Sequence, residues 1–266
     1  MEMAGYLASL IIGVSLGLLG GGGSILTVPV LVYLFMVPSV EATTYSLFIV
    51  GITSGIGSLS YFKRRLIVFK TAVVFGLPSI LAVILMRSIV LPEIPNVISF
   101  TKNIFLNKEK FILLLFALVM MLAGMNMLRR EKEENLQNLP TKNKSKVYSA
   151  IAFAGLLEGS LSGLVGAGGG FLIIPSLVLF CKIPMKQAVG TSLFIISVKS
   201  ILGFIADKNV SSTNWYLILY ISLFALMGLA FGILLSKKIE GKKLKPLFGW
   251  FLLAMSIYIL IKEITV

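Results

Sequence analysis

The chain has 266 residues, of which 57% are hydrophobic and 13% charged, and its net charge is +13. So high an apolar share in a chain of this length excludes an ordinary soluble domain. Apolar runs of about 20 residues, each long enough to cross a bilayer as a helix, recur along the sequence. The composition therefore predicts an all-α integral membrane protein with several spans.

The expected helices form two similar series. The first series, residues 1–128, has a glycine-interrupted helix pair at 4–19 and 24–37, then helices near 41–61, 66–90 and 110–128. The polar stretch 129–146, RREKEENLQNLPTKNKSK, is expected to be a solvated cytoplasmic linker. The second series, residues 147–266, has a pair at 147–165 and 170–181, then helices near 185–206, 213–236 and 244–262.

An internal duplication relates the two series. With an offset of 146 residues, 17–50 aligns with 163–196 without a gap, and 15 of the 34 positions are identical. The matches include glycines, two prolines and the serine of the shared SLF sequence, which an apolar bias alone would not align. Each series is therefore one copy of a repeated unit.

The basic residues predict how the repeats cross the membrane. If each glycine-broken pair is a re-entrant V, the loops near 63–70, 129–146, 182–186 and 237–245 share one face and hold 17 of the 24 Lys and Arg residues. The positive-inside rule then favours this arrangement with that face in the cytoplasm. Each repeat crosses three times after its V, so the two repeats are expected to be inverted. The positive charge is assigned to topology and anionic lipids, and no nucleic-acid partner is expected.

The glycine breaks predict an anion-binding site. Non-helical backbone inside a membrane is tolerated where it is buried in protein or lines a cavity, so Gly20–Gly23 and Gly166–Gly170 are expected to face a cavity or one another. A new helix starts after each break, and its free N–H groups carry about half a positive charge. Two such helix starts would bind an anion, with the Ser24 hydroxyl as a cap or donor. The alternative is close packing of glycines between helices.

Hydroxyl groups begin the helix after each V, in EATTYSLF at 41–48 and QAVGTSLF at 187–194. These hydroxyls could line the same cavity, or they could bond to carbonyls of the preceding turn. The full set of substrate-binding candidates is Gly20, Gly21, Gly22, Gly23, Ser24, Thr44, Ser46, Gly166, Gly168, Gly169, Gly170, Thr191 and Ser192.

Two charges are expected inside spans of the second repeat. Glu158 and Lys199 align with Ile12 and Thr53, so only one repeat carries them. They are candidates for proton coupling or for supplementing the positive site, and the alternative is a structural ion pair. Arg87 and Lys70 are expected to snorkel from span ends. The lone Cys181 is interpreted as inert packing, and no metal, cofactor or catalytic constellation is expected, so the chain is not expected to be an enzyme.

The duplicated pattern G-x-x-G-x-G-G-G…P, followed by A-x-x-T/Y-S-L, resembles the sulfite exporter TauE/SafE family of membrane permeases. The second repeat, GSLSGLVGAGGGFLIIPSLVLFCKIPMKQAVGTSLF, matches the pattern more closely, whereas the first has GGGGS and TTYS. The resemblance implies a multi-pass transporter of small sulfur-containing anions, such as sulfite, thiosulfate or organosulfonates, in the prokaryotic plasma membrane.

The sequence thus favours a secondary transporter that works by alternating access. The alternatives are a passive anion channel, a permease for a cation or a neutral metabolite, and a membrane enzyme or scaffold of a sulfur-metabolising complex. The expected partners are the small anion, the lipid bilayer and a coupling proton.

Overall fold

The chain is almost entirely helical in the computed structural model, which describes residues 2–21, 23–95, 97–101, 104–128, 144–165, 170–179, 181, 183–207, 214–239 and 241–265. The elements are α1 (Glu2–Leu19), α2 (Gly23–Tyr33), α3 (Ser39–Lys63), α4 (Phe69–Leu85), the π-helix η1 (Met86–Val90), α5 (Leu91–Glu93), β1 (Val97–Thr101), β2 (Ile104–Asn107), α6 (Lys108–Leu128), α7 (Lys144–Val165), α8 (Gly170–Leu179), α9 (Met185–Ile205), α10 (Trp215–Lys238) and α11 (Gly241–Thr265).

Seven stretches within the described residues are long and apolar enough to cross a bilayer. They lie in α3, in the run from α4 to α5, and in α6, α7, α9, α10 and α11. This result confirms an all-α integral membrane protein. The short hairpin β1–β2, in which Val97 pairs with Asn107, was not expected from the sequence. Its β-branched and aromatic residues favour an extended backbone over a helix.

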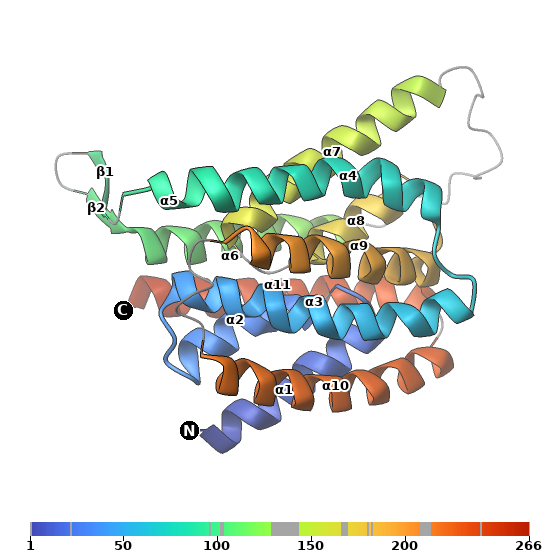
Figure 1. Cartoon of the computed structure of the whole chain (residues 1–266), viewed down its shortest axis with the longest axis horizontal. Coiled ribbons are helices and arrows are strands. Elements are labelled where there is room, and N and C mark those ends of the chain that lie inside the picture. Colours follow the sequence, from blue (N-terminus) through green and yellow to red (C-terminus); the bar gives the residue numbers. More distant parts are fainter. Residues whose placement is uncertain are drawn as a thin grey trace.

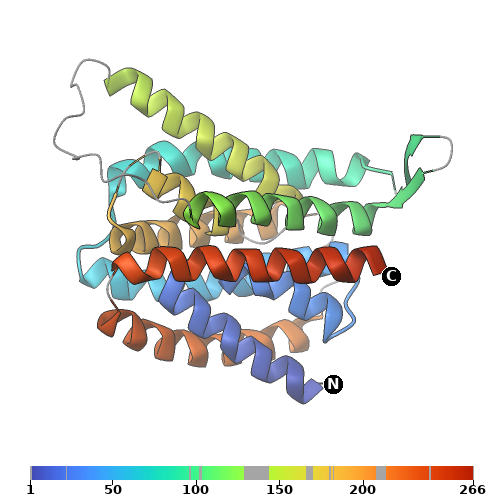
Figure 2. The same cartoon turned by 180° about the vertical axis from the view of Figure 1, so that it is seen from behind.

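The helices pack in pairs that follow the duplication. With the 146-residue offset, α1 corresponds to α7 and α4 to α10, and the structure packs α1 on α10 and α7 on α4. The helices α3 and α9, which correspond under the same offset, pack on each other, and α6 packs on α11, the last helix of the other series. Figures 1 and 2 show the resulting bundle, with both termini at the same end. How these units sit in a bilayer stays a prediction.

One hydrogen bond occurs twice, at equivalent places. The Tyr45 hydroxyl accepts the backbone N–H of Asn214 just before α10, at 3.0 Å. At the positions 146 residues away, the Thr191 hydroxyl accepts the backbone N–H of Val68 just before α4, also at 3.0 Å. In both places a side chain satisfies an N–H at a helix start, where no partner within the helix exists.

Close backbone contacts hold the outer helix pairs together. A Cβ added to Gly13 of α1 would overlap the Ala225 carbonyl of α10, and one added to Gly159 of α7 would overlap the Ser79 carbonyl of α4. Gly13 and Gly159 are equivalent in the two repeats. Packing of small residues, weighed above as the alternative for the glycine breaks, thus operates at glycines that precede the breaks.

The centre of the bundle is the antiparallel pair α3 and α9. Thr44 near the start of α3 bonds to Asp207 just after α9, whereas Tyr61 near the end of α3 lies against Gly190 near the start of α9. Of the apolar windows in these helices, 61% of that in α3 and 72% of that in α9 is buried, more than in any other described span. Their many hydroxyl groups are therefore shielded from both lipid and water.

Candidate functional site

The two glycine breaks meet at the centre of the bundle. Helix α1 ends at Leu19, and Gly20 has a φ of 74°, a left-handed conformation that glycine adopts without strain. A Cβ on Gly21 would overlap the backbone of Gly170, the first residue of α8, and a Cβ on Gly170 would overlap Gly21. The breaks therefore face one another, one of the two arrangements expected from the sequence. Gly22, Gly166, Gly168 and Gly169 lie outside the described residues.

The hydroxyls near this junction make local hydrogen bonds. The Ser24 hydroxyl donates to the Gly21 carbonyl at 2.6 Å. The Ser192 hydroxyl donates to the Val189 carbonyl at 2.9 Å, and its Oγ would be 3.0 Å from a Cβ placed on Gly20. Ser192 is thus beside the break, and its hydroxyl proton would have to leave a backbone carbonyl before it could donate to a ligand.

The hydroxyls of Thr191, Thr44 and Ser46, which were also predicted to bind the substrate, have other surroundings than those of Ser24 and Ser192. Thr191 is occupied by the N–H of Val68, and Thr44 donates to Asp207 Oδ2 at 2.8 Å. Ser46 is fully buried, and its Oγ has no hydrogen-bond partner among the described residues. The structure therefore gathers Gly20, Gly21, Ser24, Gly170 and Ser192 at the junction, and it places Thr44 in a separate cluster.

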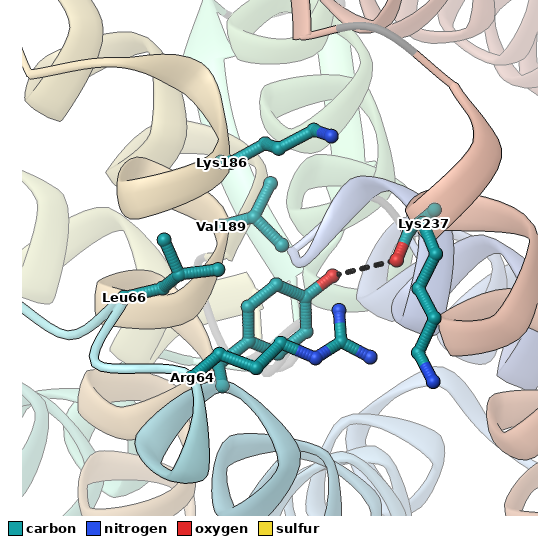
Figure 3. Close-up of a pocket in the computed structure, with 7 residues that line it drawn as sticks. Arg64, Leu66, Lys186, Val189 and Lys237 are labelled. Carbon is teal, nitrogen blue, oxygen red and sulfur yellow. Dashed lines mark hydrogen bonds between the residues drawn. The ribbon is translucent and has the colours of Figure 1, made fainter.

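A pocket of about 300 Å³ opens beside the junction (Figure 3). Its cationic residues come from three segments: Arg64 follows α3, Lys186 lies in the first turn of α9, and Lys237 lies in the last turn of α10. None of the described residues that line it is acidic; they are Tyr61, Arg64, Leu66, Lys186, Val189, Ser236 and Lys237. Clefts lined by one sign of charge concentrate counter-ions, so this pocket attracts anions.

The floor of the pocket reaches the first glycine break. The Tyr61 hydroxyl donates to the Gly17 carbonyl at 3.1 Å, in the last turn of α1, and it contacts Ser236 Oγ at 3.2 Å, the dashed line in Figure 3. Val189, another lining residue, is the nearest neighbour of a Cβ placed on Gly20. One layer of side chains therefore separates the pocket from the glycine junction.

The sequence predicted the basic loops but not the pocket that they form. The basic loops near 63–70 and 237–245 were interpreted as signals of topology and of contact with anionic lipids, and Tyr61 and Ser236 were not singled out. The pocket exists because three chain segments meet at one end of the central helix pair. The available sequence signal was the excess of Lys and Arg in loops that share a predicted face.

Glu158 and Lys199 form a buried ion pair. The Lys199 ammonium donates to Glu158 Oε1 at 2.5 Å, and the Ser79 hydroxyl donates to Oε2 at 2.6 Å. Both charged side chains are almost completely buried. The structural pair that the sequence left as an alternative is thus present, and Lys199 is neutralised where it stands.

Arg87 does not snorkel, so that expectation is wrong. Its side chain is fully buried in η1, and Nη1 donates to Asp207 Oδ2 at 2.7 Å and to Thr43 Oγ1 at 3.0 Å. A partner 120 residues further along the chain holds it inside, a pairing that the sequence pattern did not indicate. Lys70, in contrast, is exposed at the start of α4, with its ammonium 4.8 Å from the centre of the Tyr148 ring.

Few groups in the described part of the chain suit redox or metal chemistry. Among these residues no three His, Cys, Asp or Glu side chains lie together as a metal site would require. Cys181 is half-buried between α8 and α9, and burial raises the pKa of its thiol to about 11. A thiol in such a site reacts slowly at neutral pH.

Fold and site together define a polytopic helical membrane protein whose two broken helix pairs meet beneath a cationic pocket. Comparison with known families identifies it further: the chain belongs to the sulfite exporter TauE/SafE family, whose model matches residues 6–259.

The relatives are named as transporters. The chain is 28% identical to a "Probable membrane transporter protein" of Xylella fastidiosa over 261 residues, which cover 94% of this chain and 91% of the relative. It is 28% identical to "Probable membrane transporter protein YunE" of Bacillus subtilis, over 88% of each chain. A relative in Methanocaldococcus jannaschii is 37% identical over 41% of this chain and 43% of its own. No solved structure matches the chain. The family and these names indicate a membrane transporter.

Proposed function

We propose that this protein is a secondary transporter that moves a small sulfur-containing anion, such as sulfite, thiosulfate or an organosulfonate, across the plasma membrane. The observation that carries the proposal is the cationic pocket, which one layer of side chains separates from the junction of the two helix breaks. Membership of the TauE/SafE family supports the sulfur-containing substrate class.

The pocket supports a route for the anion. Arg64, Lys186 and Lys237 attract it and replace part of its hydration shell. Beyond Tyr61 and Val189 lie the glycine breaks, where the helix starts of α2 and α8 offer N–H groups and partial positive charge. Ser192 adds a hydroxyl beside Gly20. None of these groups neutralises the anion completely, so the anion can leave again.

The paired architecture supports a mechanism of alternating access. In this structure the pocket lies at the α3 end that includes Tyr61, while the opposite end of α3 is tied to Asp207 through Thr44. Rocking of one repeat against the other would close the pocket and open the opposite end. Proton coupling through Glu158 belongs to the same proposal, because its protonation would release Lys199.

The test is transport into proteoliposomes that contain the purified protein. Radiolabelled sulfite, thiosulfate and sulfoacetate are supplied outside, with taurine, sulfate and chloride as competitors. Saturable uptake that an internal excess of the same anion accelerates supports a transporter. Uptake that does not saturate and shows no counterflow indicates the passive channel, and an absence of uptake of every sulfur anion refutes the substrate class.

A matched pair of variants tests the site itself. Ser192→Ala removes the hydroxyl beside Gly20, whereas Ser197→Ala removes one that makes the same kind of bond, to the Phe194 carbonyl at 2.8 Å, further along α9. The first is expected to raise KM for the anion, and the second to leave it unchanged. In parallel, an anion at a hundred times its Kd should stabilise the protein by about 2.7 kcal/mol. Equal effects of both variants on KM would refute the assigned position of the site.

A further inference from the structure

The buried side chain of Arg87 has N–H groups that make no hydrogen bond to the described residues. A guanidinium carries five N–H groups, and in Arg87 only Nη1 is engaged, by Asp207 and Thr43. Nε and Nη2 are buried and have no hydrogen-bond partner among the described residues. Buried donors are normally satisfied, so each unsatisfied one calls for an explanation. The residue also lies in the π-helical turn η1, and π-helical turns recur at functional sites.

The two unused nitrogens form one edge of the guanidinium. Nε–H and Nη2–H point side by side, which is the fork that matches two oxygens of a carboxylate, sulfonate or sulfite. Arginines paired with a carboxylate frequently present such a fork to it. Arg87 instead contacts Asp207 by joining Nη1 to Oδ2, outside the fork. The fork therefore has no acceptor among the described residues.

The position of this cluster corresponds to that of the basic pocket at the other end of the bundle. With the 146-residue offset, Asp207 is the counterpart of Tyr61, the residue on the pocket floor. Tyr61 lies near the end of α3, and Asp207 directly follows the antiparallel helix α9. At that opposite end, hydrogen bonds from Arg87 and Thr44 to Asp207 join α3, η1 and the end of α9. One end thus has a cationic pocket, and at the equivalent place of the other end hydrogen bonds tie the described elements together.

We propose that Arg87 is a second oxyanion-binding residue, used when the end opposite the basic pocket opens. While that end is closed, Asp207 and Thr43 hold the guanidinium through Nη1. When it opens, the fork of Nε and Nη2 receives the transported oxyanion. Asp207 contacts a different nitrogen of the guanidinium, but its negative charge offsets that of Arg87 and therefore weakens the binding of an anion at the fork. This inference rests on the proposed function and adds the residue that binds the anion at the second end.

The experiment measures KM for thiosulfate separately from each end, in proteoliposomes with a uniform protein orientation. Arg87→Lys keeps the positive charge and removes the fork. At the end that includes α5, this variant is expected to raise KM by about tenfold or more, because one charge-assisted hydrogen bond to the anion is lost. At the pocket end, KM is expected to change by less than about twofold. Lys186→Gln, in the pocket, should show the opposite pattern.

A second variant, Asp207→Asn, is expected to change KM in the opposite direction. It removes the negative charge of the carboxylate and leaves the fork in place, so KM at the α5 end is expected to fall. Thermal unfolding in detergent verifies that each variant is folded. Equal changes of KM at both ends, or no change with Arg87→Lys, would overturn the assignment, as would a higher KM at the α5 end with Asp207→Asn. If the wild-type protein moves no sulfur oxyanion from either end, the proposed function fails instead.

Discussion

The buried pair of Glu158 and Lys199 allows a double-mutant cycle in which the double variant carries the residues of the first repeat. The equivalent positions of the first repeat hold Ile12 and Thr53. The variants are therefore Glu158→Ile, Lys199→Thr and the combination of both. Each single change leaves one charge buried beside an apolar or neutral group, and the double change reproduces the first repeat.

The expected magnitudes follow from the contacts. Removing one partner of a buried ion pair costs about 3–5 kcal/mol, because the other charge is left without compensation. Replacing both partners removes both desolvation penalties and is often neutral or stabilising. The Ser79 hydroxyl then loses Glu158, which costs about 1–3 kcal/mol. The threonine at position 199 can bond to the Ile195 carbonyl, as Thr53 bonds to the Ile49 carbonyl at 2.7 Å. We expect the double variant to be at least about 2 kcal/mol more stable than Lys199→Thr.

The assay is unfolding by a denaturing detergent, followed by circular dichroism, on protein purified in a mild detergent. Transport driven by a proton gradient is measured on the same samples. If Glu158 couples protons, the double variant is folded but no longer responds to the gradient. A double variant no more stable than the worse single variant would refute the reasoning, and so would two single variants that each lose less than about 1 kcal/mol.

Three further outcomes are expected. Gly21→Ala forces a methyl group into the Gly170 backbone, so it should lower the free energy of unfolding by about 1–3 kcal/mol and abolish most transport. The control is Gly55→Ala, whose Cβ would have an ordinary 3.6 Å contact with Ser197. It should leave stability in detergent unfolding unchanged or slightly raised. Lys186→Gln should raise KM for the anion up to about tenfold and weaken its dependence on ionic strength, and Lys63→Gln, exposed at the same end but outside the pocket, should not. Because burial raises the pKa of Cys181 to about 11, its thiolate fraction is small at neutral pH, and alkylation monitored by mass spectrometry should accelerate steadily as the pH rises toward that value.

The periodicity and repetition of the sequence were enough to predict most helices. Residues 41–61 were expected in the helix that the structure extends to Ser39–Lys63, and 213–236 in the helix at Trp215–Lys238. Helix ends were less predictable. The expected helix 24–37 ends at Tyr33, because the chain turns there and Met36 adopts a φ of 55°. Local propensity carries little information about such a turn, which tertiary packing determines.

The candidate site was predictable only where it repeats. The sequence predicted that the duplicated breaks face either a cavity or one another, and the structure shows the second arrangement through the contact of Gly21 with Gly170. Arg87 and Asp207 have no such signal, because their equivalents in the other repeat are unrelated residues and 120 positions separate them. The pocket likewise depends on how three distant segments converge. Contacts between unlike residues of the two repeats therefore had to come from the structure.

The two repeats share one backbone arrangement but carry different charged residues. Tyr45 and Thr191 satisfy equivalent helix starts, and under the same offset the pair of α1 and α10 maps onto the pair of α7 and α4, while α3 maps onto α9. Such an arrangement has nearly the same energy when its two ends exchange roles, which is what alternating access requires. Lys186 at one end and Arg87 with Asp207 at the other break that equality. Under the proposals above, separate ammonium and guanidinium groups bind the anion at one end and a guanidinium fork at the other, so we expect these side chains, and not the shared backbone, to set the difference in affinity between the two ends. Exchanging charges between the ends should therefore alter the ratio of the two KM values while the helix packing is preserved.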